Sequence, residues 1–181
     1  WQCTRLDLYA SALNKLHRHD LAYICHCTRK QIRALAKPGP LGLIYPGNCR
    51  KKKHLFDTRH AIRLRTHEHA ISFNDKLQGR TELNLYNDVG DFLLRRGDGL
   101  AAYHLAVTVD DALQNITDVV RGSDLLLSTP CHIHVQQCLG YVQPGYTHIP
   151  IATDKGGKKL SKRGGADELN SGLAGANLVR G

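Results

Sequence analysis

Three cysteines close together in the sequence have the chemistry of a metal site: Cys25, Cys27 and Cys49. Thiolates are soft ligands, and Zn²⁺ binds four ligands in a tetrahedral arrangement. The gap of one residue between Cys25 and Cys27 is tighter than the common two-residue spacing, so one turn would supply both ligands. Because a site closed by protein ligands has no open position, we expect a structural ion that fixes an otherwise irregular loop.

The spacing leaves the identity of the fourth ligand open. His54 lies five residues after Cys49 and is the natural candidate by ligand chemistry, whereas His26 is constrained between two cysteines. Tyr45, four residues before Cys49, would be an unusual phenolate ligand.

A run of lysines bounded by glycines has the chemistry of a phosphate site. Residues 158–163 are Lys-Lys-Leu-Ser-Lys-Arg, with glycine pairs at 156–157 and 164–165. Lysines on a flexible loop can close over a polyphosphate and neutralise the charge that develops in a transition state.

The composition limits the class of protein. The length of 181 residues suits one large domain or two small ones, and a hydrophobic fraction of 41% is ordinary for a globular protein. The formal net charge of +9 suits a partner that bears phosphate. The six cysteines are too sparse for a disulfide scaffold, and Cys131 and Cys138 are expected to fill apolar space in a helix. No run is apolar enough to span a bilayer and no signal peptide is recognisable, so we expect a cytoplasmic protein.

The elements that would position these residues begin with a helix over residues 4–18, because Leu6, Leu13 and Leu16 recur at helical spacing and Thr4 can cap its start. Residues 19–53 are expected to be irregular, since their Pro-Gly pairs mark loops. Polar and apolar residues alternate over 61–65, which predicts a half-buried strand, and residues 71–73 are a shorter candidate strand.

The second half of the sequence has a different pattern. Two short apolar runs, 105–109 and 116–120, predict buried strands that end at charged residues, as in parallel α/β sheets that bind ligands at the carboxyl ends of strands. Thr129 as N-cap, Pro130 as first residue and Gly140 as stop predict a helix over 130–139.

Together these motifs carry a resemblance to a known family. Residues 159–163, Lys-Leu-Ser-Lys-Arg, resemble the KMSKS motif of class I aminoacyl-tRNA synthetases. From Arg95 to Lys162 the order and spacing are similar to the glutamate-specific branch of that class, including Tyr-His-Leu-Ala-Val at 103–107, Val-Val-Arg-Gly-Ser-Asp-Leu-Leu at 119–126 and His-Ile-Pro at 148–150.

Two members of that branch are candidates: glutamyl-tRNA synthetase, and a paralogue without an anticodon-binding domain that attaches glutamate to queuosine in the anticodon of tRNA(Asp). Residues 25–29 and 45–50 resemble the zinc module of the paralogue, in which three Cys and one Tyr hold the ion. The resemblance therefore favours the paralogue, and it implies Tyr45 rather than His54 as the fourth ligand.

The resemblance also implies roles for single residues. Tyr103 and Arg121 match glutamate-binding residues of the family, and a guanidinium pairs well with a carboxylate. Lys162 matches the catalytic lysine that contacts ATP and stabilises phosphate charge, and Lys159 belongs to the same ATP-binding motif. Two roles are open for Asp110 and Asp111: a contact to the substrate ammonium, or a helix cap.

The fold implied is α/β. Residues 91–181 would form the second half of a Rossmann-type catalytic domain, and residues 1–90 a zinc-bearing α/β insertion. The family's HIGH motif is absent from the sequence, so we expect a fragment that, by itself, does not form the adenylate.

The expected partners are L-glutamate, ATP with Mg²⁺, and tRNA(Asp) bearing queuosine, and the expected state is a monomer. The alternatives are a catalytic fragment of glutamyl-tRNA synthetase and a non-catalytic, zinc-stabilised RNA-binding module.

Overall fold

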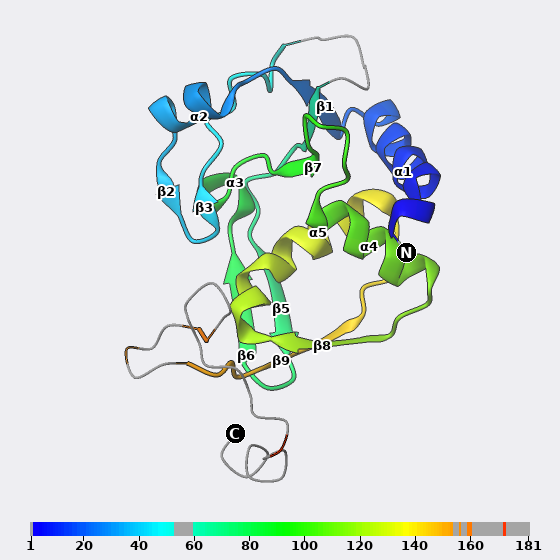
Figure 1. Cartoon of the computed structure of the whole chain (residues 1–181), viewed down its shortest axis with the longest axis vertical. Helices are drawn as coiled ribbons and strands as arrows, with labels where there is room; N and C mark the ends of the chain where they lie inside the picture. Colours follow the sequence, from blue (N-terminus) through cyan, green and yellow to red (C-terminus); the bar gives the residue numbers. More distant parts are fainter. Residues whose placement is uncertain (1, 53–59, 154–155, 157–158, 161–171, 173–181) are drawn as a thin grey trace.

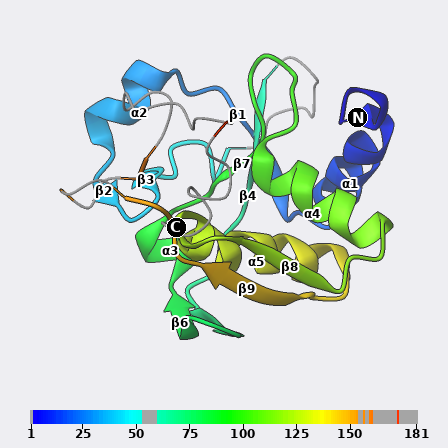
Figure 2. The same cartoon turned by 60° about the horizontal axis from the view of Figure 1, so that its bottom comes forward.

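Three helices, α1 (Leu6–Arg18), α4 (Tyr103–Leu113) and α5 (Thr129–Leu139), pack against one another. The computed structural model describes residues 2–52, 60–153, 156, 159–160 and 172. Figure 1 shows α4 and α5 between a three-stranded sheet and a pair of parallel strands, and Figure 2 shows the same arrangement with that pair brought forward.

The first part of the chain contains three sets of antiparallel strands, together with helices. Its elements are η1 (Gln2–Thr4), α1 (Leu6–Arg18), β1 (Ala22–Cys25), α2 (Arg29–Leu35), β2 (Pro38–Gly39), β3 (Gly42–Leu43), β4 (Ala61–Leu64), β5 (Ile71–Asp75), β6 (Gly79–Leu83), α3 (Leu85–Asp88) and β7 (Leu93–Arg95). The sheet has the order β1-β4-β7 and is antiparallel, whereas β2–β3 and β5–β6 are hairpins. The strands expected over 61–65 and 71–73 are confirmed as β4 and β5.

The second part forms a β-α-β unit. Its elements are α4 (Tyr103–Leu113), β8 (Asp118–Gly122), η2 (Ser123–Ser128), α5 (Thr129–Leu139) and β9 (Gly145–Ile149). β8 and β9 pair in parallel, with Arg121 opposite His148, and α5 makes the crossover between them. The fold is therefore mixed α/β, as expected, and the parallel strands present their carboxyl ends on one side.

Apolar side chains of the three central helices and the three-stranded sheet share one core. Leu16 of α1, Leu94 of β7, Leu105 of α4 and Val135 of α5 are all fully buried. The predicted role of Cys131 is confirmed, because its side chain lies in this core. In the described part of the chain, no helix has the length and apolar character needed to cross a membrane.

The prediction of a strand over 105–109 is wrong, because these residues lie in the middle of helix α4. Leu105, Ala106 and Val109 are buried at the spacing of one helical face. A short apolar run fits a buried strand and a buried helix equally well, and packing against α1 and α5 decides for the helix here. The run 116–120 is a strand in part: β8 begins at Asp118, and Val120 is 64% exposed rather than buried.

The prediction that residues 19–53 are irregular is also wrong. They include β1, α2 and the β2–β3 hairpin. A capping box begins α2, since Thr28 accepts a hydrogen bond from the Gln31 backbone and the Gln31 side chain accepts one in return. That pattern is visible in the sequence and marks the helix.

Two predicted caps are displaced by one residue. The N-cap of α1 is Arg5 rather than Thr4, because Thr4 belongs to the preceding 3-10 turn. The N-cap of α5 is Ser128, which makes Thr129 the first helical residue. Gly140 ends α5 as predicted, with a φ of 70° that favours glycine.

One buried carboxylate, Asp91, joins the loops at one end of the three-stranded sheet. It accepts hydrogen bonds from the Tyr23 hydroxyl (2.5 Å) and from the backbone and hydroxyl of Thr66 (2.8 and 3.0 Å), and it pairs with Arg50. The Asp91 backbone carbonyl also accepts from Arg63. The loop that carries Cys49 is thereby tied to strands β1 and β4.

Replacing Asp91 with alanine is expected to lower the free energy of unfolding by about 3 kcal/mol, because Tyr23, Thr66 and Arg50 lose a charged acceptor in a buried place. Urea unfolding measures this. The matched control is Asp98→Ala, since Asp98 is exposed and pairs with the exposed Arg96, and its cost is expected to stay below about 1 kcal/mol. Equal losses in the two variants would contradict this account of Asp91.

Candidate functional site

The three cysteines predicted as metal ligands meet in the structure. Their Sγ atoms all lie within 4.8 Å of one another, and the Cys27 and Cys49 sulfurs are 3.5 Å apart. Four sulfurs around one zinc ion at about 2.3 Å would stand about 3.8 Å apart, so this cluster fits a tetrahedral ion. Cys25 ends β1, Cys27 precedes the cap of α2, and Cys49 follows in a turn. None of the three is in a disulfide.

Tyr45 lies at the same point. Its Oη atom is 3.4 Å from Cys25 Sγ and 3.5 Å from Cys27 Sγ, and it accepts a hydrogen bond from the Cys49 backbone at 3.0 Å. Gly90 permits this position, because a Cβ there would come within 2.7 Å of the Tyr45 carbonyl oxygen. The other candidate ligand, His54, lies outside the described residues.

The environment of this cluster is apolar and basic. Burial raises the pKa of Tyr45, and it raises the pKa of the Cys27 thiol to about 11. The guanidinium carbon of Arg63 lies 3.7 Å from the centre of the Tyr45 ring, and Arg63 is only 7% exposed. Desolvated thiols lose their protons readily only beside a cation, so the donor set suits a bound metal ion.

A second constellation surrounds Arg121 near the carboxyl end of β8. Its Nε donates to His148 Nε2 (2.9 Å), and its Nη2 donates to Thr129 Oγ1 (2.7 Å) and to the Leu125 carbonyl (3.4 Å). The remaining nitrogen, Nη1, faces the Tyr103 hydroxyl at 3.3 Å. The structure therefore brings together the two residues predicted for glutamate binding, and Tyr103 lies on the exposed side of the guanidinium, with 46% of its surface exposed.

Two neutral histidines border this constellation. Burial lowers the pKa of His132 to about 2 and the pKa of His104 to about 4, and the charge of Arg121 adds to both effects. His132 Nδ1 lies 3.1 Å from Arg121 Nη1. Its other ring nitrogen, Nε2, and Nδ1 of His104 are buried and have no hydrogen-bond partner within the described ranges. Buried polar atoms without a partner are rare and require an explanation, such as a water or a ligand that binds there.

One residue of the lysine run, Lys159, lies near the same end of β8. Lys159 makes an ion pair with Asp124, which lies three residues beyond Arg121, and it forms an antiparallel bridge with Thr153. Lys162, the predicted catalytic lysine, lies outside the described residues.

Asp110 and Asp111 have separate surroundings. Asp110 accepts from Arg5 Nε (2.6 Å) and from the Tyr9 hydroxyl (2.8 Å), so it fastens α4 to α1. Burial raises the pKa of Asp111 above its ordinary value, while the charge of Arg121 lowers it. In this structure Asp110 is therefore a packing residue between helices.

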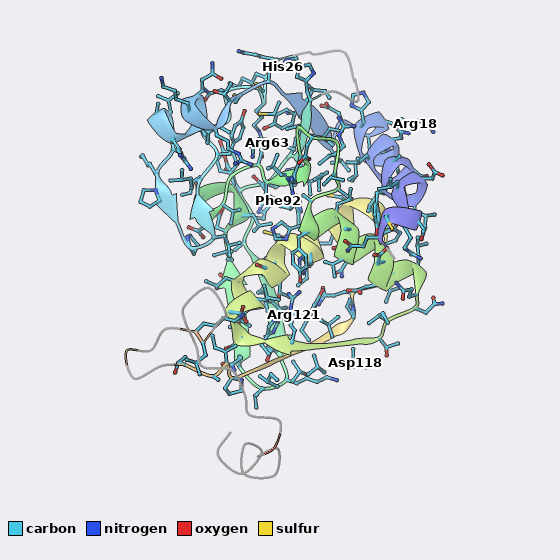
Figure 3. All side chains as sticks on the ribbon, in the orientation of Figure 1. Arg18, His26, Arg63, Phe92, Asp118 and Arg121 are labelled. Atoms are coloured by element: carbon cyan, nitrogen blue, oxygen red, sulfur yellow. The ribbon has the colours of Figure 1, made fainter. Side chains whose placement is uncertain are left out.

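A groove of about 470 Å³ lies between the two constellations. Its lining includes Tyr45 and Arg63 from the cysteine side, Tyr103 from the Arg121 side, and Arg96 between them. Figure 3 labels Arg63, Phe92 and Arg121, and it shows Phe92 between the two arginines. Aromatic, apolar and basic side chains thus line one continuous surface.

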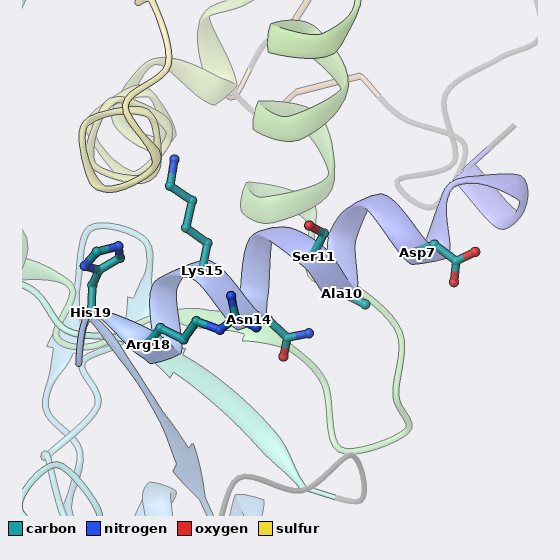
Figure 4. A pocket seen from close by; sticks show the side chains of 7 residues that line it. All are labelled: Asp7, Ala10, Ser11, Asn14, Lys15, Arg18 and His19. Carbon is teal, nitrogen blue, oxygen red and sulfur yellow. The ribbon is translucent and has the colours of Figure 1, made fainter.

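A different hollow lies along α1, and neither the cysteine cluster nor Arg121 contributes to it. Lys15 at its edge donates to the Leu139 carbonyl at 2.7 Å. Figure 4 shows its lining residues, none of which the sequence predicted for a site: Asp7, Ala10, Ser11, Asn14, Lys15, Arg18 and His19.

The sequence patterns do not identify the residues that hold Arg121. His148 occurs only within the motif His-Ile-Pro, Thr129 is predicted only as a helix N-cap, and His132 lies inside the helix predicted over 130–139. No local signal identifies them, because they come from different elements and their roles depend on the crossover that α5 makes between β8 and β9.

Comparison with known families gives one match over nearly the whole chain. Residues 1–174 match the family described as tRNA synthetases class I (E and Q), catalytic domain.

Individual relatives agree with this match. The chain is 48% identical to the glutamyl-Q tRNA(Asp) synthetase of Dechloromonas aromatica, over 99% of this chain and 60% of that protein. It is 46% identical to the protein of the same name from Methylococcus capsulatus, over 98% of this chain and 57% of that protein. The chain thus spans less than two thirds of the length of these relatives.

A solved structure has a similar fold. The crystal structure of a glutamate tRNA ligase from Elizabethkingia meningosepticum, in complex with its amino acid, superposes with a TM-score of 0.73 at 25% identity. The superposition covers 91% of this chain and 36% of that one.

Proposed function

Because the chain belongs to the class I tRNA synthetases for glutamate and glutamine, we propose that its protein activates L-glutamate with ATP and transfers it to queuosine in the anticodon of tRNA(Asp). The observation that carries the proposal is the contact between Arg121 and Tyr103 beside the loop of Lys159. The names of the relatives at 48% and 46% identity support the acceptor.

Arg121 and Tyr103 bind the glutamate in this proposal. The carboxylate pairs with the exposed Nη1 side of the guanidinium, where Tyr103 lies, while Nε and Nη2 keep their protein partners. A preformed cation that is held on three sides loses little freedom when the substrate binds. The hydroxyl of Tyr103 fixes the orientation of the substrate carboxylate.

The lysine loop serves ATP. Class I synthetases use ATP with Mg²⁺, and we assign phosphate contacts to Lys159 and Lys162, with Lys162 as the catalytic lysine that stabilises charge as the adenylate forms. The pairing of Lys159 with Asp124 supports this assignment, because it puts Lys159 close to the end of β8.

Cys25, Cys27, Cys49 and Tyr45 hold a structural zinc ion in this proposal. Their proximity supports the set, and a closed tetrahedral ion supplies cross-linking rather than chemistry. The ion would connect the end of β1 to the start of α2 and to the turn of Cys49.

We propose that the acceptor RNA binds along the groove between the two constellations. Tyr103 offers an aromatic surface for a base and Arg96 a charge for phosphate, and the formal net charge of +9 favours an RNA partner. We also propose that the protein works as a monomer in the cytoplasm, where its substrates are.

We propose that the chain divides into a zinc-bearing part (1–90) and the second half of a Rossmann-type catalytic domain (91–181). β4 of the first part pairs with β7 of the second, so the two would share a sheet.

The test uses the protein that carries this chain. Exchange of label between pyrophosphate and ATP is expected to depend on glutamate and to occur without tRNA. Labelled glutamate is then expected on tRNA(Asp) that bears queuosine, and to be absent from the same tRNA made without queuosine. Label on the 3′ end of tRNA(Glu) instead would favour an ordinary glutamyl-tRNA synthetase, and absence of exchange would refute the proposed activity.

A further inference from the structure

Strands β5, β8 and β9 each supply one residue to a chain of hydrogen bonds that ends at Arg121. Asp75 is the last residue of β5, His148 lies in β9, and Arg121 lies in β8. The side chains of Asp75 and His148 are both completely buried. A buried carboxylate and imidazole that nothing in the proposed chemistry uses require an explanation.

The hydrogen bonds of Asp75 determine which nitrogen of His148 carries the proton. Asp75 Oδ1 accepts from the backbone N–H groups of His148 (3.1 Å), Leu77 (3.0 Å) and Gln78 (2.8 Å). Burial raises the pKa of Asp75, but the hydrogen bonds from Gln78 and His148 outweigh it and lower that pKa to about 2, so the group is an anion at neutral pH. Its second oxygen, Oδ2, lies 2.6 Å from His148 Nδ1.

A carboxylate only accepts hydrogen bonds, so His148 Nδ1 must carry the proton. The opposite nitrogen, Nε2, then has a free electron pair, and the Nε–H of Arg121 donates to it at 2.9 Å. The anion of Asp75 thus acts on Arg121 through the tautomer of His148.

A nucleophilic triad is a different interpretation of part of this geometry, because Thr129 Oγ1 lies 3.2 Å from His148 Nε2. Thr129 is completely buried, and its oxygen accepts from Arg121 Nη2 at 2.7 Å. An alcohol without access to substrate cannot attack it, so Thr129 also belongs to the support of the guanidinium.

We propose that Asp75 and His148 are positioning residues, which hold the Arg121 guanidinium with its Nη1 side toward Tyr103 and the substrate carboxylate. This inference rests on the proposed role of Arg121 in glutamate binding. The β5–β6 hairpin, which supplies Asp75, thereby contributes to recognition of the amino acid.

The sharpest test is Asp75→Asn. Three backbone N–H groups face Oδ1, so the amide oxygen of the new side chain must take that position and its NH₂ group must face His148 Nδ1. The imidazole then carries its proton on Nε2, where it opposes the N–H of Arg121. The KM for glutamate is expected to rise by about 10-fold to 100-fold, with the KM for ATP unchanged.

Nitrogen NMR of the His148 ring provides a second readout, since the protonated nitrogen is expected to be Nδ1 in the native protein and Nε2 in Asp75→Asn. His148→Gln places an amide oxygen near the position of Nε2, and we expect it to keep the glutamate KM within about 5-fold of the native value, whereas His148→Phe is expected to raise it by at least about 10-fold. A tautomer that stays unchanged in Asp75→Asn, together with an unchanged KM, would overturn the inference.

A double-mutant cycle separates positioning from general damage. In an Arg121→Lys background, which lacks Nε, Asp75→Asn is expected to change the glutamate KM less than about 2-fold. The matched control is His134→Gln, because His134 is also buried but contacts the Arg65 carbonyl instead of Arg121, and its glutamate KM is expected to be native. A native protein without exchange would refute the proposed function, whereas an active native protein with additive effects in the cycle refutes only this inference.

Discussion

Replacing Arg121 with alanine is expected to raise the KM for glutamate by about 100-fold or more while the KM for ATP stays within about 3-fold. The change removes a charge-assisted contact to a carboxylate, which is worth about 3 kcal/mol in a partly buried site. Glutamate-dependent exchange between pyrophosphate and ATP measures both constants in the same assay.

Two controls make this result specific. Arg80→Ala removes an arginine that pairs with the exposed Glu82 on the β5–β6 hairpin, and it is expected to leave both KM values unchanged. Arg121→Lys keeps the positive charge but loses the planar fork, so we expect an intermediate loss. A native glutamate KM in Arg121→Ala would show that the substrate carboxylate binds elsewhere.

Replacing Cys49 with serine is expected to reduce bound zinc from about one ion per chain to near zero, because three remaining ligands do not close a tetrahedral site. The free energy of unfolding is expected to fall by about 3 kcal/mol or more, since metal binding energy is folding energy where a loop has few apolar contacts. Metal analysis of the purified protein and urea unfolding measure the two effects.

The identity of the fourth ligand follows from two further variants. Tyr45→Phe is expected to weaken zinc retention against a chelator, and His54→Ala is expected to leave it unchanged. Cys3→Ser is the control for loss of a thiol, because Cys3 is exposed and is not part of the cluster. Full zinc content in Cys49→Ser would refute the metal site, and loss in His54→Ala alone would replace Tyr45 by His54.

The two expected effects concern different properties of the molecule. The cysteine cluster lies at the junction of β1 and α2, and Arg121 lies in β8. Loss of zinc is therefore expected to affect folding first, and loss of Arg121 is expected to affect substrate binding first. A Cys49→Ser protein that remains folded is therefore expected to keep its glutamate KM.

Local patterns in the sequence predicted the elements whose burial follows a clear period. The helix over 4–18, the strand over 61–65 and the helix over 130–139 all exist, with ends displaced by one or two residues. The pattern failed over 105–109, where five consecutive residues, Leu-Ala-Val-Thr-Val, have no period that separates strand from helix. It also missed α2, although the capping box of Thr28 and Gln31 marks its start.

The sequence by itself determined the chemical groups and the family: three thiols that could share an ion, a lysine run, and a motif order that belongs to one family. Such features can be identified in the sequence because residue type and short spacing are local properties. Only the tertiary structure decided that Tyr45 lies against the cysteines and that Asp75, His148 and Arg121 form one chain of hydrogen bonds. Asp75 and His148 are 73 residues apart, and no local rule connects them. Their contact arises because the β5–β6 hairpin packs on the parallel strands, which depends on the packing of the whole core.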